Sequence, residues 1–259
     1  MMKHAYKLIL LLLSALVLLF IIAPLLGMFL ATSAPELFAT ARDSEVMKSI
    51  RLTLFTSLGA TIFMAIGAIP LAYVLARKNF YLKKMVSGII DLPIVIPHSA
   101  AGIAILGFLS RNSALGKAAS SVGIDFVGNP LGIAAAMAFV SIPFLINAAR
   151  DGFENVPVRL EKAALSLGAS PVKVFFTISL PMAKRSVISG LVMMFARGLS
   201  EFGAVVIIAY HPMITPILIF ERFSSYGLQY ARPVAVVFIL ITLFVFIAMR
   251  WISGGKKHA

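Results

Sequence analysis

The amino-acid sequence has no cysteine, a single tryptophan and few acidic residues. Without cysteine the chain cannot form disulfides, use a thiolate nucleophile or bind a metal through sulfur. It has four histidines and no H-E-x-x-H motif, so we expect no catalytic residues, no metal site and no enzyme activity. It also lacks the G-x-x-x-x-G-K-S/T phosphate loop, so we expect no nucleotide cofactor bound by this chain.

Apolar residues make up 60% of the 259 residues, and the mean hydropathy is +0.99. A soluble domain of this length cannot bury so much apolar surface in one core, so the composition predicts a membrane protein. The 23 Lys and Arg outnumber the 10 Asp and Glu, which gives a formal net charge of +13. These basic residues lie in short clusters between apolar runs instead of on one face, so we expect no nucleic-acid binding.

Six apolar segments are long enough to cross the roughly 30 Å hydrocarbon core of a bilayer as helices. We therefore predict an all-α fold, with residues 1–259 forming one transmembrane domain. The first segment resembles a signal peptide, but its apolar run exceeds the usual length of about 7–15 residues, so we expect a retained helix instead of a cleaved leader. The predicted spans are 8–30, 52–76, 85–109, 131–149, 187–210 and 234–251.

The distribution of basic residues predicts the orientation of the chain. Six spans place both termini on one side of the membrane. That side receives 15 Lys and Arg, including Lys256 and Lys257, whereas the other receives 7, and Arg197 lies within a span. Because loops rich in Lys and Arg remain in the cytoplasm, we predict a multi-pass protein of the cell membrane with both termini cytoplasmic.

The longest predicted cytoplasmic loop, residues 150–185, has a helical pattern that is too polar to span the membrane. Pro157 is suited to open a helix, and Gly168 is suited to end it. Ser170 and Pro171 then fit the N-cap and first position of a second helix, which we expect to end before Pro181. The residues alone leave two roles open: a compact knob that binds another protein, or an amphipathic helix lying on anionic membrane lipid.

The same loop resembles the E-A-A-x3-G-x9-I-x-L-P motif of the membrane subunits of binding-protein-dependent ABC importers. Lys162 takes the place of the motif's Glu, and Glu161 lies one residue earlier. The resemblance implies that the loop is a coupling helix that docks onto an ATP-binding cassette subunit, which would itself bind ATP and magnesium. Its candidate residues are Glu161, Lys162, Ala163, Ala164, Gly168, Ala169, Ser170, Pro171, Ile178, Leu180 and Pro181.

Two opposite charges, Arg197 and Glu201, lie four residues apart in the fifth predicted span and so share one helical face. An unpaired charge at the bilayer centre costs about 3 kcal/mol, so the two are expected to pair and to face the protein interior. They form either a structural ion pair within the helix or a brace for the bend or gate of a pathway.

Pro93 and Pro97 each remove a helical hydrogen bond in the third predicted span and permit a kink there. For His98, next to this stretch, we favour packing against a backbone carbonyl over contact with a substrate. Asp91 is expected at the headgroups near the cytoplasmic end of the span, with capping of the kinked helix as a further role.

Two of these segments narrow the resemblance. R-x-L-x-E-F-G-A, from Arg197 to Ala204, resembles molybdate, tungstate and sulfate permeases, and L-P-x-x-x-P-x-x-x-A-G, from Leu92 to Gly102, resembles the molybdate and tungstate branch. The resemblance implies a homodimer that imports an oxyanion delivered by an external binding protein, with tungstate or molybdate favoured over sulfate. An ion-coupled secondary transporter with Arg197 and Glu201 as a relay is the alternative from another class. The candidate pathway residues are Pro93, Pro97, His98, Arg197, Glu201, Phe202 and Gly203.

Overall fold

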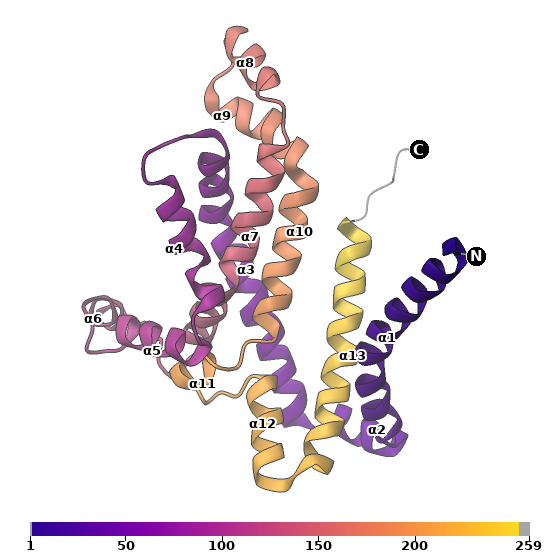
Figure 1. The fold of residues 1–259 in the computed structure, drawn as a ribbon. Helices are drawn as coiled ribbons and strands as arrows, with labels where there is room; N and C mark the ends of the chain where they lie inside the picture. The colour runs from indigo at the N-terminus through magenta and orange to yellow at the C-terminus, as the bar shows by residue number, and fades with distance from the viewer. Residues whose placement is uncertain (1, 254–259) are drawn as a thin grey trace.

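A computed structural model of the chain describes residues 2–253, and this part of the chain is helical and contains no β-strand (Figure 1). The all-α prediction is therefore confirmed. The elements are α1 (Met2–Leu30), α2 (Ala34–Arg42), α3 (Ser44–Arg77), α4 (Lys83–Val95), α5 (His98–Leu109), α6 (Ala114–Ser121), α7 (Pro130–Glu154), α8 (Val158–Ser166), α9 (Pro171–Val174), the π-helical turn η1 (Phe175–Ser179), α10 (Leu180–Leu199), α11 (Val205–Ile208), α12 (Thr215–Tyr226) and α13 (Leu228–Ser253).

Five stretches of the described chain are long and apolar enough to cross a membrane as single helices, and the bent pair α4 and α5 brings the total to six. This pair confirms the kink expected within the predicted span 85–109, and the two helices meet at an angle of 112°. The break follows from Pro97, which lacks a backbone N–H and disfavours helical geometry at the preceding residue. Ile96 accordingly has extended backbone angles, whereas Pro93 is accommodated within α4.

The fifth predicted span, 187–210, also differs from the structure. One continuous helix runs from Pro171 to Leu199, and the backbone then leaves helical geometry before the short helix α11. Near the C-terminal end of this helix, the Phe195 carbonyl accepts a hydrogen bond from a side chain of α3, the Ser57 hydroxyl, at 2.8 Å. Apolarity continues past Leu199, which is why hydropathy alone extends the span too far.

The centre of the fold is formed by α3, α7 and α10, whose buried side chains make one core that includes Leu75, Leu145 and Met194. Glycine allows the close approach: a side chain at Gly190 would meet the backbone of Leu145 at 3.1 Å. A second core joins α5 and α11 to α7. The most apolar stretch of α1 is not buried against the rest of the described chain.

Three short helices, α2, α6 and α12, were not predicted. They are too short or too polar to register as spans, and local capping defines two of them. Ser33 and Glu36 form a reciprocal capping box at the start of α2, and Ser113 caps α6.

The fold has two distinct ends. Helices α8 and α9 project at one end, toward which the N-terminal end of α1 and the C-terminal end of α13 are also directed, whereas α2 and α12 lie at the opposite end (Figure 1). Lys256 and Lys257 lie outside the described residues, as do the side chains of Lys3 and Arg250. The assignment of the α8 end to the cytoplasm stays a prediction.

Candidate functional site

The loop after α7 contains a helix, a glycine turn and a second helix. Pro157 precedes α8, and Gly168 adopts a φ of +85°, a left-handed conformation that favours glycine. The turn is closed by the hydrogen bond from the Ala169 N–H to the Ala164 carbonyl at 3.0 Å. Ser170 then caps α9, because its hydroxyl accepts from the Lys173 N–H at 3.3 Å.

The second helix does not end before Pro181, contrary to prediction; it continues through η1 into α10. A proline inside an α-helix lacks a donor and its ring clashes with the carbonyl four residues earlier. The π-helical turn is wider, and the Leu180 N–H bonds to the Phe175 carbonyl across it. The chain thereby passes Pro181 without a break, so the projecting loop and the membrane helix are mechanically one element.

Glu161 points inward from α8 and anchors this helix to the end of α3. Its carboxylate accepts from Arg77 at 2.8–3.0 Å, from the Ser179 hydroxyl at 2.6 Å and from the Tyr73 hydroxyl at 3.4 Å. Arg77 also donates to the Val156 carbonyl at 3.0 Å. Burial opposes ionisation of Glu161, but the bonds from Arg77 and Ser179 outweigh it, so the pKa of Glu161 lies below its ordinary value.

The tip of the loop carries an apolar surface that is not covered by its own chain. Leu167 is 89% exposed, and Leu165 and Val172 lie beside it in an exposed state. Lys162 and Ala163 are exposed as well, whereas Ala164 and Ala169 are half-buried. Ile178 and Leu180 are half-buried near η1, and Pro181 is exposed. The tip therefore presents small and apolar side chains, and Lys162 does not share the internal contacts of Glu161.

A buried ion cluster lies where the two broken helices meet. Glu201 is fully buried, and its Oε2 lies 3.1 Å from Arg197 Nη2 and 3.0 Å from His98 Nδ1. Arg197 Nη2 also lies within 2.9 Å of both His98 ring nitrogens. Glu201 Oε1 accepts from the Ala204 N–H at 2.9 Å.

This geometry corrects two predictions. Glu201 follows the end of α10 and is outside the helix that carries Arg197, so the pair is not an intrahelical one. The polar contacts of His98 are to the side chains of Arg197 and Glu201, and the predicted backbone carbonyl is not its partner. Neither contact was predictable from the sequence, since His98 and Arg197 are 99 positions apart.

Close contacts pack the start of α5, after the break at Pro97, against the non-helical segment that follows α10. A Cβ on Gly102 would lie 2.8 Å from the Ala204 carbonyl, and one on Gly203 would lie 2.8 Å from the Cβ of His98. Phe202, next to Glu201, packs its ring against Phe220 of α12 with centroids 5.1 Å apart. Helix α5 and the chain after α10 therefore form one packed unit around the cluster.

Asp91 lies within α4 and is half-buried, so it does not cap the helix. Its Oδ1 accepts from Asn147 Nδ2 of α7 at 2.6 Å. This contact ties α4 to the central helices.

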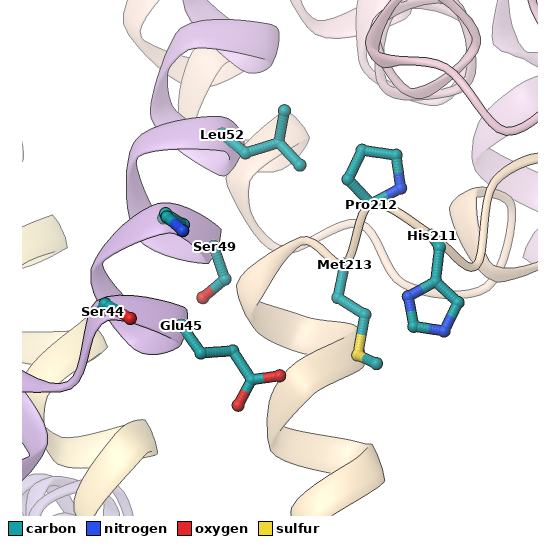
Figure 2. Close-up of a pocket in the computed structure, with 8 residues that line it drawn as sticks. Ser44, Glu45, Ser49, Leu52, His211, Pro212 and Met213 are labelled. Carbon is teal, nitrogen blue, oxygen red and sulfur yellow. The ribbon is translucent and has the colours of Figure 1, made fainter.

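A cavity of about 410 Å³ opens at the end of α3 opposite to α8. Figure 2 shows Ser44, Glu45, Ser49 and Leu52 of α3 on one side and the segment His211–Met213 on the other. Lys48 also lines it. Among residues 2–253, no group of three or more His, Asp or Glu is placed to hold a metal ion.

Comparisons with known proteins agree with this architecture. The family described as "Binding-protein-dependent transport system inner membrane component" matches residues 68–257. The molybdate/tungstate transport system permease protein WtpB of Pyrococcus furiosus is 43% identical over 242 residues, 93% of this chain and 92% of the relative, and that of Methanocaldococcus jannaschii is 40% identical over 90% of each. A probable sulfate transport system permease protein of Marchantia polymorpha is 34% identical over 85% of this chain and 78% of the relative.

The fold is also found in a solved structure. A subunit in the crystal structure of a bacterial ABC transporter that imports the polysaccharide alginate superposes with a TM-score of 0.75, at 18% identity, and the match covers 98% of both chains.

Proposed function

Because this chain belongs to the family of binding-protein-dependent transport system inner membrane components, we propose that it is the permease subunit of an ATP-driven importer of molybdate and tungstate. The observation that carries the substrate class is the 43% identity, over 93% of the chain, to a permease of these two oxyanions. Sulfate is the second candidate, since a probable sulfate permease is 34% identical over 85% of the chain. The subunit moves its substrate without covalent chemistry.

The exposed tip of α8 and α9 is the proposed docking site for the ATPase subunit, which would bind ATP and magnesium. Its apolar side chains, of which Leu167 is the most exposed, are not buried by their own chain, so another surface is needed to bury them. An interfacial helix would place them in lipid, but the Glu161 to Arg77 contact holds α8 against the end of α3. The contact of Glu161 with Arg77 therefore favours a rigid projection that binds another protein.

Two connections would transmit movement of the docked knob to the membrane. The first is the carboxylate of Glu161 on Arg77, which ties α8 to α3. The second is the uninterrupted helix Pro171–Leu199, whose 29 residues span about 43 Å at a rise of 1.5 Å per residue. This helix ends beside Arg197 and Glu201, so a tilt at the knob displaces the ion cluster.

The remaining partners follow from this role. Two copies of the permease would enclose the pathway, two ATPase subunits would dock at the two knobs, and an external binding protein would deliver the oxyanion to the opposite face. Both termini would be cytoplasmic, on the side of α8.

Competition for uptake tests the substrate. Cells that express the permease, its ATPase and its binding protein should take up labelled tungstate, with unlabelled molybdate competing strongly and sulfate weakly. Dominant competition by sulfate would replace the proposal with the second candidate. Uptake that follows a proton gradient and persists without the ATPase would instead support an ion-coupled secondary transporter.

A double substitution, Gly168→Trp with Ala164→Arg, tests the docking site. It places bulk and charge at the turn, so the ATPase should no longer co-purify with the permease. A matched control exists away from the loop, where Gly123 also has a positive φ of +79° in open space after α6. Gly123→Trp with Leu115→Arg should leave the complex intact, and an intact complex in the first variant would contradict docking at this turn.

A further inference from the structure

In the ion cluster, the basic side chains are partly exposed, whereas the carboxylate that accepts their hydrogen bonds is buried. Glu201 is fully buried, whereas the side chains of His98 and Arg197 are 36% and 21% exposed. Arg197 Nη1 also donates to the hydroxyl of exposed Ser200 at 3.3 Å. The Ser200 hydroxyl in turn donates to the Arg197 carbonyl at 3.1 Å. A guanidinium is a donor only and has five N–H groups, so Arg197 is the main donor of the exposed face. The exposed face therefore suits an anion.

The depth of this face shows that it does not lie against hydrocarbon. Arg197 is about 18 Å along α10 from Arg185 at a rise of 1.5 Å per residue, which places it well inside a hydrocarbon core about 30 Å thick. A basic side chain facing lipid there costs about 3 kcal/mol. In the single chain this face is open, so water or another protein surface must cover it in the membrane.

We propose that a second copy of this chain covers this face, and that the two sets of Arg197, His98 and Ser200 together form a transit site for the transported oxyanion. The inference rests on the proposed import of an oxyanion and assigns the residues that contact it. A twofold interface presents the same patch from both subunits, and the proposal places this patch at the axis, where each set faces its counterpart. A tetrahedral oxyanion on this axis can accept from both copies, and one copy alone supplies only half of the donors.

Two further features of the cluster suit an anion in transit. Helix α5 begins at His98, and no side chain caps its first turn, so the positive end of its dipole points toward the site. Glu201 offsets the charge of Arg197 from behind and fixes the positions of both Arg197 and His98. The site therefore attracts an oxyanion through oriented donors without the large net charge that would trap it. Glu201 is a positioning residue in this arrangement.

Cysteine labelling tests the site directly, because the natural chain has no cysteine. Ser200→Cys and Ser99→Cys, made separately in the reconstituted permease, ATPase and binding-protein complex, place a thiol beside Arg197 and His98. An anionic methanethiosulfonate, which does not partition into lipid, should label both thiols. Phe55→Cys is the control, because Phe55 is 70% exposed on α3. It lies at a depth similar to that of Arg197, since the neighbouring Ser57 donates a hydrogen bond to Phe195 of α10. We expect this thiol, on the lipid-facing side, to react slowly.

Tungstate should protect the two thiols from labelling. At ten times its Kd, tungstate should slow the reaction about tenfold, whereas chloride at the same ionic strength should not. Labelling of Ser200→Cys and Ser99→Cys no faster than that of Phe55→Cys would show that the face is covered by lipid and overturn the proposal. Labelling that tungstate up to about 10 mM does not slow would also overturn it, because even a millimolar site would then be occupied.

A transport assay separates this inference from the proposed function. Arg197→Gln with Glu201→Gln removes both charges together, so no unpaired charge is left buried. The number of tungstate ions imported per ATP hydrolysed should fall at least about tenfold, equivalent to a loss of 1.4 kcal/mol. A wild-type ratio in this variant would refute the transit site and leave the importer role intact. Absence of ATP-dependent uptake of any oxyanion by the wild-type complex would refute the importer role itself.

Discussion

Glu161→Ala should release α8 from the membrane domain without unfolding the rest of the chain. The substitution removes the carboxylate that accepts from Arg77, Ser179 and Tyr73. The two charged side chains are only 8% and 11% exposed, so Arg77 would be left as a nearly buried, unpaired cation. Breaking a buried ion pair by removing one partner costs about 3–5 kcal/mol. Because the other side chains of α8 are mostly exposed, this cost falls on the attachment of α8.

Hydrogen exchange measured by mass spectrometry can detect this release. A loss of about 3 kcal/mol raises the population of the opened helix by about two orders of magnitude, and amide exchange across 158–167 should accelerate accordingly. Exchange across α6 should not change. Glu154→Ala is the matched control, because Glu154 is half exposed and its closest approach to Arg150 is 4.0 Å, a surface pair worth at most about 1 kcal/mol.

The double variant Glu161→Gln with Arg77→Gln should restore part of the protection, since removing both members of a buried pair leaves no isolated charge. Exchange of α8 within about threefold of wild type in Glu161→Ala would refute the anchor, because it would limit the contribution of Glu161 to under 1 kcal/mol.

The same assay has a predicted pH dependence. The pKa of Glu161 is lower in the folded chain than in an unfolded one, where it is about 4.3, so the folded chain favours the ionised form. The stabilisation is therefore complete above about pH 5 and is lost as the pH falls through the folded pKa. After correction for intrinsic exchange, α8 protection should be constant from about pH 8 to 5 and should decline below about pH 4.

Substitutions at three further positions have defined outcomes. Glu201→Ala leaves Arg197 unpaired inside the membrane and should sharply reduce the yield of folded protein in detergent, and a wild-type yield with normal transport would show that the ion pair is dispensable. Gly168→Ala should destabilise the α8–α9 turn by about 1 kcal/mol because of its positive φ, seen as faster local exchange, with Gly168→Asn milder; equal exchange in both variants would contradict this. Gly102→Ala should lower the thermal stability by about 1–3 kcal/mol, since its Cβ would lie 2.8 Å from the Ala204 carbonyl; an unchanged melting temperature would show that α5 can shift away.

The hydropathy pattern was sufficient to predict the membrane helices and the all-α fold, because span length and apolarity are local properties of the chain. It failed where local apolarity and backbone geometry differ. Residues 85–109 are mostly apolar, so hydropathy treats them as one span; the kink expected from the prolines occurs at Pro97 and divides them into two helices at 112°. The chain is apolar again from Ala204 to Tyr210, but Glu201 is held outside the helix by the Ala204 N–H and His98.

In the candidate sites, features that depend on neighbouring residues were predictable, whereas contacts between residues far apart in the sequence were not. The glycine turn at Gly168 and the cap at Ser170 follow from neighbouring residues and were predictable. The role of Glu161 was not, because its partner Arg77 is 84 positions away and no local pattern indicates the contact. His98 was likewise assigned to a backbone carbonyl because nothing near it in the sequence indicated Arg197.

The π-helical turn between Phe175 and Ser179 determines how far the knob is rotated about the helix axis relative to the membrane helix. A π turn holds about one residue more than an α turn, and each residue of an α-helix is a rotation of about 100°. The face of the chain that is proposed to meet the ATPase is thus offset by one residue from the face that packs on α3 and α7. Deleting one residue from this turn would return it to α geometry, rotate the knob relative to the bundle and bring the ring of Pro181 against the carbonyl four residues earlier, so the helix would also bend there. The extra residue of the π turn therefore sets the direction of the knob and accommodates Pro181 at the same time.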